Sequence, residues 1–368
     1  MPGRRRGRTR AGRGRRCLLW MLAGALLVAG CLGGIAVWQN TYALREERVV
    51  LRHHGQRLEG VLARPPAGEG RFGLVVFVHG DGPVDATHDT FYRPLWESFA
   101  QAGYASLSFS KPGVAGSEGD WLEQSMDDRA AETLAAVAWA RSRPDIDGRR
   151  IGVWGASQAG WVLPKVAARD RRLQFVIAVS PAVNWVRQGR YNLLAELRRE
   201  GADQRRIDQA MRRRETTLRL LRRGASYEEY RAATGDLGDA DDSGDTGDVT
   251  PGRWRFIAKN YTADAVADLR AMRNTRVLLV LAGHDVNVDV TETEAVYRKI
   301  LPASTLTVEH YSDATHSLVD HNTERSPLRL TATAVLAPRK LYAAGFLDGQ
   351  ARFLRRTGLG DGPGESAS

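Results

Sequence analysis

The sequence predicts an α/β fold in which a mostly parallel central sheet carries helices on both faces. Short runs of apolar and β-branched residues alternate along the chain with longer segments of helical pattern. The runs are apolar at nearly every position, as expected for strands buried on both faces of a parallel sheet. With 368 residues the chain is long enough to bury a sizeable core.

The expected elements follow in a regular order. A hairpin that turns at His54-Gly55 should open the fold. Further strands are expected at residues 72–80, 104–110, 150–157, 173–181, 275–283 and 304–311. Helices are expected at 91–103 and 125–142, from Gln158, from Thr291, and at the C-terminus up to about Arg356. In such sheets functional groups collect at the carboxyl ends of the strands.

The formal net charge of +10 is concentrated at the N-terminus, where eight arginines precede residue 17 and no acidic residue occurs before Glu46. The rest of the chain is close to neutral. Because nucleic-acid binding needs a basic face on a folded surface, we expect no nucleic-acid partner.

An apolar run of 22 residues without a charge, 17–38, follows the arginines. A helix of this length spans about 33 Å, which is enough to cross a bilayer. The one-sided positive charge predicts that the arginines stay in the cytoplasm and that the rest of the chain lies outside. A retained membrane anchor is the first interpretation. A cleaved signal peptide, or a lipoprotein signal with Cys31 of "VAGC" as the lipidated residue, are the alternatives.

Composition divides the chain into expected parts. They are a basic tail at 1–16, the apolar segment 17–38, a folded domain at 46–356 and a flexible tail at 357–368. Within the domain, residues 184–262 interrupt the strand pattern and are expected to form a helical cap, with an acidic loop at 235–248. Cys17 and Cys31 are the only cysteines, so the domain has no cysteine nucleophile or cysteine zinc site.

Three residues that could form a nucleophile–base–acid set each follow a predicted strand. Ser157 lies in "GASQAG" at a tight strand-to-helix turn, with Gly155 and Ala159 at the spacing of a nucleophile elbow. Asp285 follows the strand at 275–283, and His316 follows the strand at 304–311. A serine hydroxyl needs a base and an orienting carboxylate, and the order serine, acid, histidine suits this fold.

A glycine-containing turn, "HGDGP" at residues 79–83, follows another strand. Acyl transfer requires two N–H groups that point at the developing oxyanion. We expect these from the backbones of Asp81 and Gln158, with the Asp81 carboxylate turned away, toward its own loop or His79.

Together, "HGDGP", "SKPGVAGSEGDW", "GASQAGW", "AGHDVNV" and "ATHSL" resemble bacterial α/β-hydrolases of the exported esterase type, near the prolyl-oligopeptidase-like and acyl-CoA-thioesterase-like branches. The resemblance implies the α/β-hydrolase fold, with Ser157 as nucleophile, His316 as base, Asp285 as acid, and Asp81 and Gln158 as oxyanion donors.

The expected function is that of a membrane-anchored serine hydrolase that cleaves carboxylic esters through an acyl-enzyme. Its partners would be a small ester or acyl substrate and the membrane, and no cofactor or metal is expected. A peptidase or thioesterase with the same triad, or a non-catalytic binding protein, are the alternatives. The sequence leaves the oligomeric state open.

Overall fold

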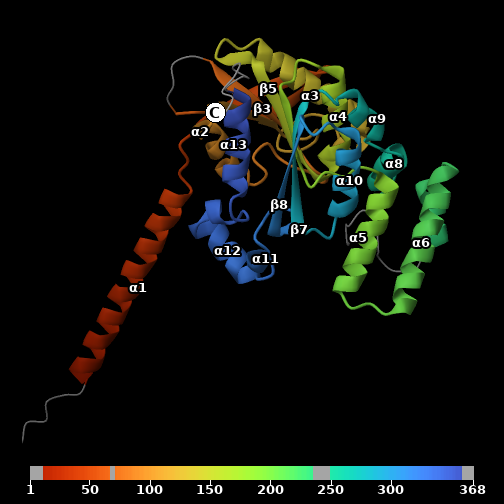
Figure 1. Ribbon diagram of the computed structural model, residues 1–368. Helices are drawn as coiled ribbons and strands as arrows, with labels where there is room; N and C mark the ends of the chain where they lie inside the picture. Colours follow the sequence, from red (N-terminus) through yellow and green to blue (C-terminus); the bar gives the residue numbers. More distant parts are fainter. Residues whose placement is uncertain (1–10, 67–70, 235–248, 359–368) are drawn as a thin grey trace, which may run out of the picture.

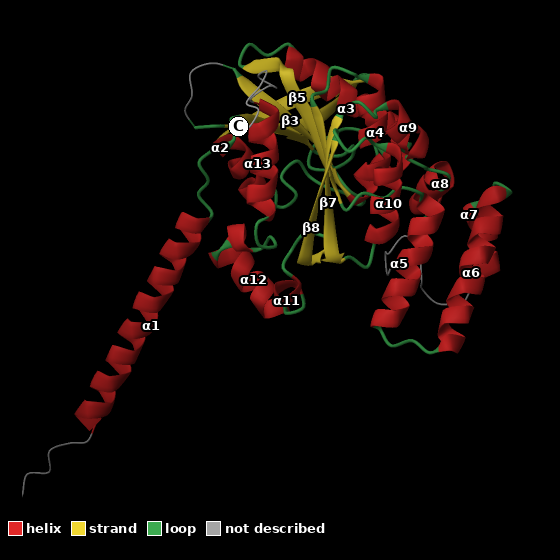
Figure 2. Cartoon of the chain, in the orientation of Figure 1, coloured by secondary structure: helices red, strands yellow, loops and turns green. Residues whose placement is uncertain are grey.

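The domain is built on one twisted sheet, in the order β1-β2-β4-β3-β5-β6-β7-β8 (Figures 1 and 2). The computed structural model describes residues 11–66, 71–234 and 249–358. The strands are β1 (Arg45–His53), β2 (Gln56–Arg64), β3 (Phe72–Val78), β4 (Tyr104–Phe109), β5 (Ile146–Ala156), β6 (Phe175–Val179), β7 (Arg276–His284) and β8 (Leu306–Thr315). β1–β2 and β2–β4 pair antiparallel, and the other neighbours pair parallel.

Helices cover both faces of the sheet, as predicted. One face carries α2 (Arg93–Gln101) and α13 (Phe346–Gly358). The other carries α3 (Met126–Arg141), α4 (Leu163–Arg169), α9 (Val266–Ala271) and α10 (Val290–Ile300). Because successive strand residues point to opposite faces, β3 sends Val75 and Phe77 into the first core and its alternate residues into the second. The mostly parallel sheet with helices on both faces, predicted from the sequence, is therefore confirmed.

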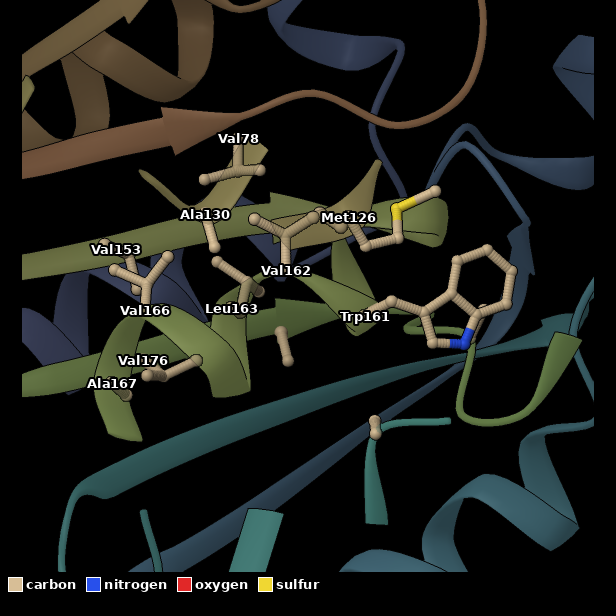
Figure 3. Packing of buried hydrophobic residues seen from close by; sticks show 14 of the residues in the cluster. Val78, Met126, Ala130, Val153, Trp161, Val162, Leu163, Val166, Ala167 and Val176 are labelled. Carbon is tan, nitrogen blue, oxygen red and sulfur yellow. The ribbon is translucent and has the colours of Figure 1, made fainter. Parts of the chain in front are cut away.

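The core around the end of β5 packs tightly (Figure 3). Val153 of β5 and Val176 of β6 lie with Leu163 and Val166 of α4 in one buried cluster, all but Val176 fully inaccessible to solvent. Close packing of this kind fixes side-chain positions, since few voids remain for rearrangement. It gives the turn after β5 a rigid base.

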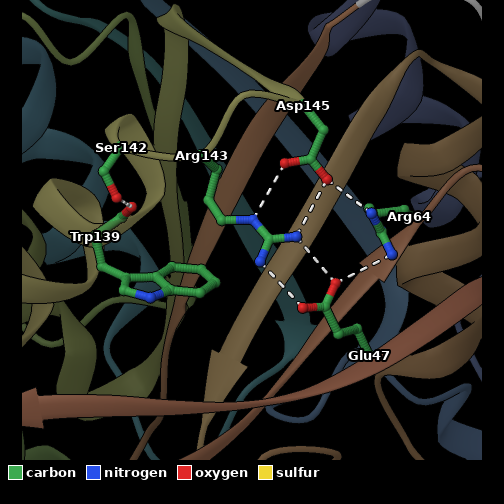
Figure 4. A network of polar contacts seen from close by, with 6 residues as sticks. All are labelled: Glu47, Arg64, Trp139, Ser142, Arg143 and Asp145. Carbon is green, nitrogen blue, oxygen red and sulfur yellow. Dashed lines mark hydrogen bonds and ion pairs between the residues drawn. The ribbon is translucent and has the colours of Figure 1, made fainter.

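An ion-pair network links strands β1 and β2, at the edge of the sheet, to the turn that follows α3 (Figure 4). Arg143, in the turn after α3, binds the carboxylates of Glu47 and Asp145, and Arg64 of β2 binds the same two groups. All four side chains are partly exposed, at 23 to 34 %. Networks contribute more than single surface pairs because one ordered side chain serves two partners.

Besides α9, the described residues between β6 and β7 contain four further helices. They are α5 (Trp185–Arg199), α6 (Gln204–Arg222), α7 (Tyr227–Thr234) and α8 (Pro251–Asn260). α5 and α6 form a hairpin that projects beyond the sheet (Figure 1). The predicted acidic loop 235–248 lies outside the described residues, as do residues 1–10 and 359–368, which make up most of the two predicted tails.

α1 (Ala11–Gln39) stands away from the domain as a single long helix (Figure 1). Its apolar stretch Leu18–Gln39 is long enough to cross a membrane and is not buried against the protein. Near an N-terminus, such a helix is compatible with a signal peptide or with a single membrane span. Two shorter helices, α11 (His321–Glu324) and α12 (Pro327–Leu336), lie between β8 and α13.

Candidate active site

Ser157 lies at the turn where β5 ends and a 3₁₀ helix, Ser157–Trp161, begins. Its φ angle of 56° is in the left-handed region, which strains a residue with a side chain. Small neighbours make the turn possible: a Cβ on Gly155 would come within 2.6 Å of the Ala159 Cβ, and one on Gly160 within 2.3 Å of the Ala182 carbonyl. The sequence predicted an α-helix from Gln158, but the first turn is 3₁₀, and α4 begins only at Leu163.

Asp285 and His316 are brought together by the parallel pairing of β7 and β8. The His316 Nδ1 atom lies 3.0 and 2.8 Å from the two carboxylate oxygens of Asp285. The Asp285 side chain is fully buried, and its Oδ1 also accepts the backbone N–H groups of Asn287 and Val288, each at 2.8 Å. The carboxylate is therefore held by the loop that carries it, and it binds His316 through Nδ1, which leaves Nε2 for another partner.

Ser157 and His316 line the same cavity, which has a volume of about 280 Å³. Within the described residues the Ser157 hydroxyl makes no hydrogen bond to His316. Such catalytic hydrogen bonds often tighten only when substrate binds. Five aromatic side chains contribute to the walls of the cavity: Phe91, Tyr92, Trp154, Tyr342 and Phe346.

The hydroxyl groups of the two cavity tyrosines are held by the protein. The Tyr342 hydroxyl donates to the Phe91 carbonyl at 2.7 Å, and the Tyr92 hydroxyl lies 3.2 Å from Nδ1 of His79. His79 Nε2 is 2.7 Å from the Phe109 carbonyl, so Nε2 carries the proton and Nδ1 accepts from Tyr92. Burial lowers the pKa of His79 to about 3, which keeps this ring neutral. The tyrosine rings therefore present an apolar surface to the cavity.

One wall of the cavity comes from a left-handed turn. His88, Asp89 and Thr90 have φ angles of 49°, 51° and 74°. The Asp85 carboxylate holds the turn by accepting the backbone N–H groups of Thr87 and Asp89. Three strained residues in a row are rare, and such strain persists only where other contacts over-determine the backbone. The turn places His88 against the cavity and against the Tyr92 ring.

The candidate oxyanion donors, Asp81 and Gln158, both line a smaller cavity of about 80 Å³ that also contains Ser157. Gln158 is the second residue of the 3₁₀ helix, and N–H groups in a first turn have no acceptor within the helix. Within the described residues the backbone N–H of Asp81 has no hydrogen-bond partner. Trp161 and Trp185 form the apolar part of this smaller cavity and stack at 4.9 Å between ring centroids.

Of the two partners expected for the Asp81 carboxylate, its own loop and His79, the structure shows the loop, through the backbone of Gly82. The carboxylate also pairs with both terminal nitrogens of Arg253 from α8, and it accepts a hydrogen bond from Nε2 of Gln158 at 2.9 Å. Burial opposes ionisation, but the hydrogen bonds and charge of Arg253 outweigh it and lower the pKa of Asp81 to about 2. The sequence carried no signal for this pair, because Arg253 lies 172 positions away.

Two further buried cations support the same turn. Arg129 of α3 donates to the Gln158 side-chain oxygen and to the His79 carbonyl, each at 2.5 Å. Lys111 donates to the Gly80 carbonyl at 2.6 Å, and burial lowers its pKa well below the usual value. The position of Lys111 directly after a buried strand was a readable signal, whereas Arg129 looked like an ordinary helix residue. Sequence reasoning missed both.

Comparison with known proteins agrees with this architecture. Residues 46–311 match the family of X-Pro dipeptidyl-peptidases, S15. The chain belongs to this family. The resemblance to α/β-hydrolases inferred from the sequence motifs is confirmed.

Curated relatives are similar over shorter segments. The quorum-quenching protein AidA of Acinetobacter baumannii (strain MDR-ZJ06) is 34 % identical over 110 residues, 29 % of this chain and 35 % of that protein. The uncharacterised peptidase YuxL of Bacillus subtilis (strain 168) is 26 % identical over 161 residues, 41 % and 24 % of the two chains. An uncharacterised 31.7 kDa Escherichia coli protein is 25 % identical over 115 residues, 31 % of this chain and 39 % of its own length. The chain thus matches less than half of each of these relatives.

Solved structures share the fold at low identity. DcsB in complex with its substrate analogue superposes with a TM-score of 0.59 at 16 % identity, covering 86 % of this chain and 100 % of that one. The Pyrococcus furiosus esterase Pf2001 gives a TM-score of 0.53 at 15 % identity, with 85 % and 92 % covered. Est1E from Butyrivibrio proteoclasticus, with ferulic acid bound, gives 0.51 at 15 % identity, with 84 % and 98 % covered.

Proposed function

We propose that the protein hydrolyses carboxylic esters through an acyl-enzyme formed on Ser157. His316 Nε2 takes the proton of the Ser157 hydroxyl as it attacks the carbonyl, and then gives that proton to the departing alcohol. Asp285 holds the imidazole in the tautomer with the proton on Nδ1. The N–H groups of Asp81 and Gln158 stabilise the oxyanion. Water, deprotonated by His316, then releases the acid and restores Ser157.

One observation carries this proposal. The Asp285–His316 pair and the strained Ser157 come from three different strand ends, yet His316 and Ser157 line one cavity. A surface histidine or a buried structural carboxylate would not require such convergence. Strain at a lone serine is also typical of an exposed nucleophile at an elbow.

The cavities favour an ester over a peptide with a free N-terminus. Asp81 is the one acidic side chain among the described residues that line the two cavities, and it is already paired with Arg253. A peptide ammonium would therefore meet no available carboxylate. Family membership supports peptidase activity as the second candidate, with Ser157, His316 and Asp285 in the same roles.

The cavity further indicates the kind of ester. A dry cavity of about 150 Å³ is sufficient for benzene, and the aromatic cavity here has about 280 Å³. It fits one ring with a short chain, or an aliphatic group of similar size. We infer that one side of the substrate is bulky and apolar, and that α5 and α8 act as part of a cap: Tyr191 donates to the Asp285 carbonyl, and Arg253 binds Asp81.

We also propose that α1 is retained as a membrane anchor, with the hydrolase domain on the outer side. The length of the apolar stretch of α1 and the arginines that precede this stretch support this orientation.

A matched substrate set tests the activity. The full chain is assayed with p-nitrophenyl esters, the corresponding thioester and an X-Pro p-nitroanilide, beside Ser157→Ala. We expect ester cleavage that the variant loses by at least about a thousandfold. Faster cleavage of the anilide would replace the ester assignment with the peptidase one. Fluorophosphonate labelling of membrane and soluble fractions tests the location, and a labelled protein found only in the soluble fraction would refute the anchor.

A further inference from the structure

α12, Pro327–Leu336, presents an apolar face that the domain leaves uncovered. None of its residues is buried, and Leu328 and Val335 are 81 % and 49 % exposed. Leu328, Ala332 and Val335 are spaced i, i+4 and i+7, so they share one face of the helix, and all three are exposed. The partly covered residues Leu330, Thr333 and Ala334 lie on the opposite face of the helix.

α12 lies beside the end of α1. The Asn40 side chain, directly after α1, donates to the Val335 carbonyl at 2.8 Å. Arg339, three residues after α12, donates to the carbonyls of Gln39 and Thr41 at 2.6 and 3.0 Å, and it pairs with the Glu97 carboxylate of α2. These bonds hold the C-terminal end of α1 against the domain next to α12 (Figure 1).

The residues of α1 indicate the depth at which α12 sits. Trp20 and Trp38 are 78 % and 71 % exposed and lie 18 residues apart, a separation of about 27 Å along a helix. This matches the thickness of a bilayer core of about 30 Å, and tryptophan is enriched at its two boundaries. The hydrogen bonds to α12 and Arg339 are made by residues 39–41, which places α12 at the level of the outer boundary. Arg329 of α12 and the nearby Arg325 and Lys340 are exposed, as is Glu324.

We propose that α12 is an interfacial helix that lies in the headgroup region and turns Leu328, Ala332 and Val335 into the lipid. The proposal rests on the retention of α1 in the membrane. Continuity with α1 makes lipid the occupant of this face, since a helix fixed beside a membrane span meets lipid before it meets another protein. Apolar residues facing lipid with basic residues at the rim are typical of such helices.

This placement has a consequence for the substrate. The segment that carries α11 and α12 follows His316 closely in the chain. Leu318 precedes these helices and Tyr342 follows them, and both residues line the aromatic cavity. The cavity therefore lies close to the membrane surface, where esters with a bulky apolar group are concentrated.

Site-directed spin labelling of the full chain tests the contact. Cys17 and Cys31 are replaced by alanine, and single cysteines are placed by Leu328→Cys, Val335→Cys, Leu26→Cys in α1 and Arg149→Cys, whose side chain is 95 % exposed. In phosphatidylcholine–phosphatidylglycerol nanodiscs, collision with oxygen is compared with collision with a water-soluble nickel complex. We expect labels at 328 and 335 to favour oxygen several-fold more than the label at 149.

Each outcome decides one part of the proposal. Labels at 328 and 335 that behave like the label at 149, with the label at 26 in lipid, overturn the role of α12 and leave the anchor intact. A label at 26 in water refutes the anchor itself. Spin–spin broadening at 328 that vanishes at one copy per disc would assign the face to a second copy of the chain and overturn the lipid contact.

A pair of variants tests the consequence. Leu328→Asn with Val335→Asn should reduce hydrolysis of a long-chain ester embedded in the same nanodiscs several-fold, and should leave p-nitrophenyl acetate hydrolysis unchanged. Thr331→Asn, on the same exposed side, is the matched control and should change neither rate. Equal loss on both esters, or loss on neither, would contradict the placement of the cavity at the membrane surface.

Discussion

Arg129 donates a hydrogen bond from Nη1 to Oε1 of Gln158 at 2.5 Å, and this bond ties helix α3 to the residue that follows Ser157. The second nitrogen of the same guanidinium holds the His79 carbonyl. Gln158 in turn binds Asp81, which Arg253 fixes from α8. One chain of contacts thus joins both turns that carry the proposed oxyanion donors, and it keeps their N–H groups fixed before substrate arrives.

Arg129→Met should lower kcat by about tenfold to a hundredfold with a smaller change in KM, because the donors lose their alignment while the cavity stays in place. It should also lower the free energy of unfolding by about 3 kcal/mol, since it removes a buried hydrogen-bonded charge. Steady-state ester kinetics and urea unfolding measure the two effects. Arg149→Met is the control for loss of an exposed arginine, and an active-site effect of equal size there would contradict the role of Arg129.

Asp81→Asn keeps the backbone N–H but breaks the pair with Arg253. We expect a loss of about 2 kcal/mol in the free energy of unfolding at pH 7. The pKa of Asp81 is lowered to about 2 in the fold, so its contribution is present above its unfolded pKa near 4 and is lost as pH falls through 4 to 2. The loss caused by the variant should therefore shrink in acid. Urea unfolding at several pH values measures it, and a difference that does not change with pH would contradict this account.

The buried carboxyl group of Glu132 should give the free energy of unfolding the opposite pH dependence. Burial raises the pKa of its carboxyl to about 7, although the Gln124 hydrogen bond and the charge of Arg129 oppose the shift. The folded protein therefore keeps a proton that the unfolded chain releases above about pH 4.3, and stability falls as pH rises from there to about 7. Glu132→Gln should remove this decline. The free energy of unfolding of the variant, relative to that of the parent, should therefore be higher at pH 8 than at pH 5, by up to about 3 kcal/mol. Parallel pH profiles for parent and variant would disprove it.

Phe91→Ala should widen the aromatic cavity. Phe91 is partly exposed and packs on Tyr342, with 4.7 Å between ring centroids, so its removal opens the wall without emptying the core. The ratio of kcat/KM for a large over a small p-nitrophenyl ester should rise by about tenfold, as expected for a change of 1 to 2 kcal/mol in apolar contact. An unchanged ratio would show that this cavity does not hold the substrate.

Local sequence patterns predicted most of the fold. Buried strands such as Phe72–Val78 are apolar at every position and could be read directly, and the His54-Gly55 turn has the positive φ angles that its residues suggest. The parts that local pattern does not encode were missed. His310, within the strand predicted at 304–311, is exposed at the sheet edge, where it binds Glu294 of α10. Its surroundings depend on β8 being the last strand, which alternation alone does not reveal.

In the candidate site, too, the residues that follow strands could be predicted from the sequence, and those that come from helices could not. Ser157, Asp285 and His316 each follow a strand, so parallel pairing alone explains why they meet at one edge. Arg253 and Arg129 come from helices, and their contacts with Asp81 and Gln158 depend on how those helices pack. The aromatic wall of the larger cavity likewise combines Phe91, Tyr342 and Phe346 from distant parts of the chain, which no local pattern connects.

Mass mapping of a fluorophosphonate adduct on the full-length protein tests the central claim most directly. If Ser157 is the nucleophile that His316 activates, the phosphonyl group will be found on the peptide that contains Ser157. It will be absent from Ser157→Ala and will form at least about a hundredfold more slowly in His316→Gln. An adduct on another residue, or undiminished labelling of Ser157→Ala, would contradict the account.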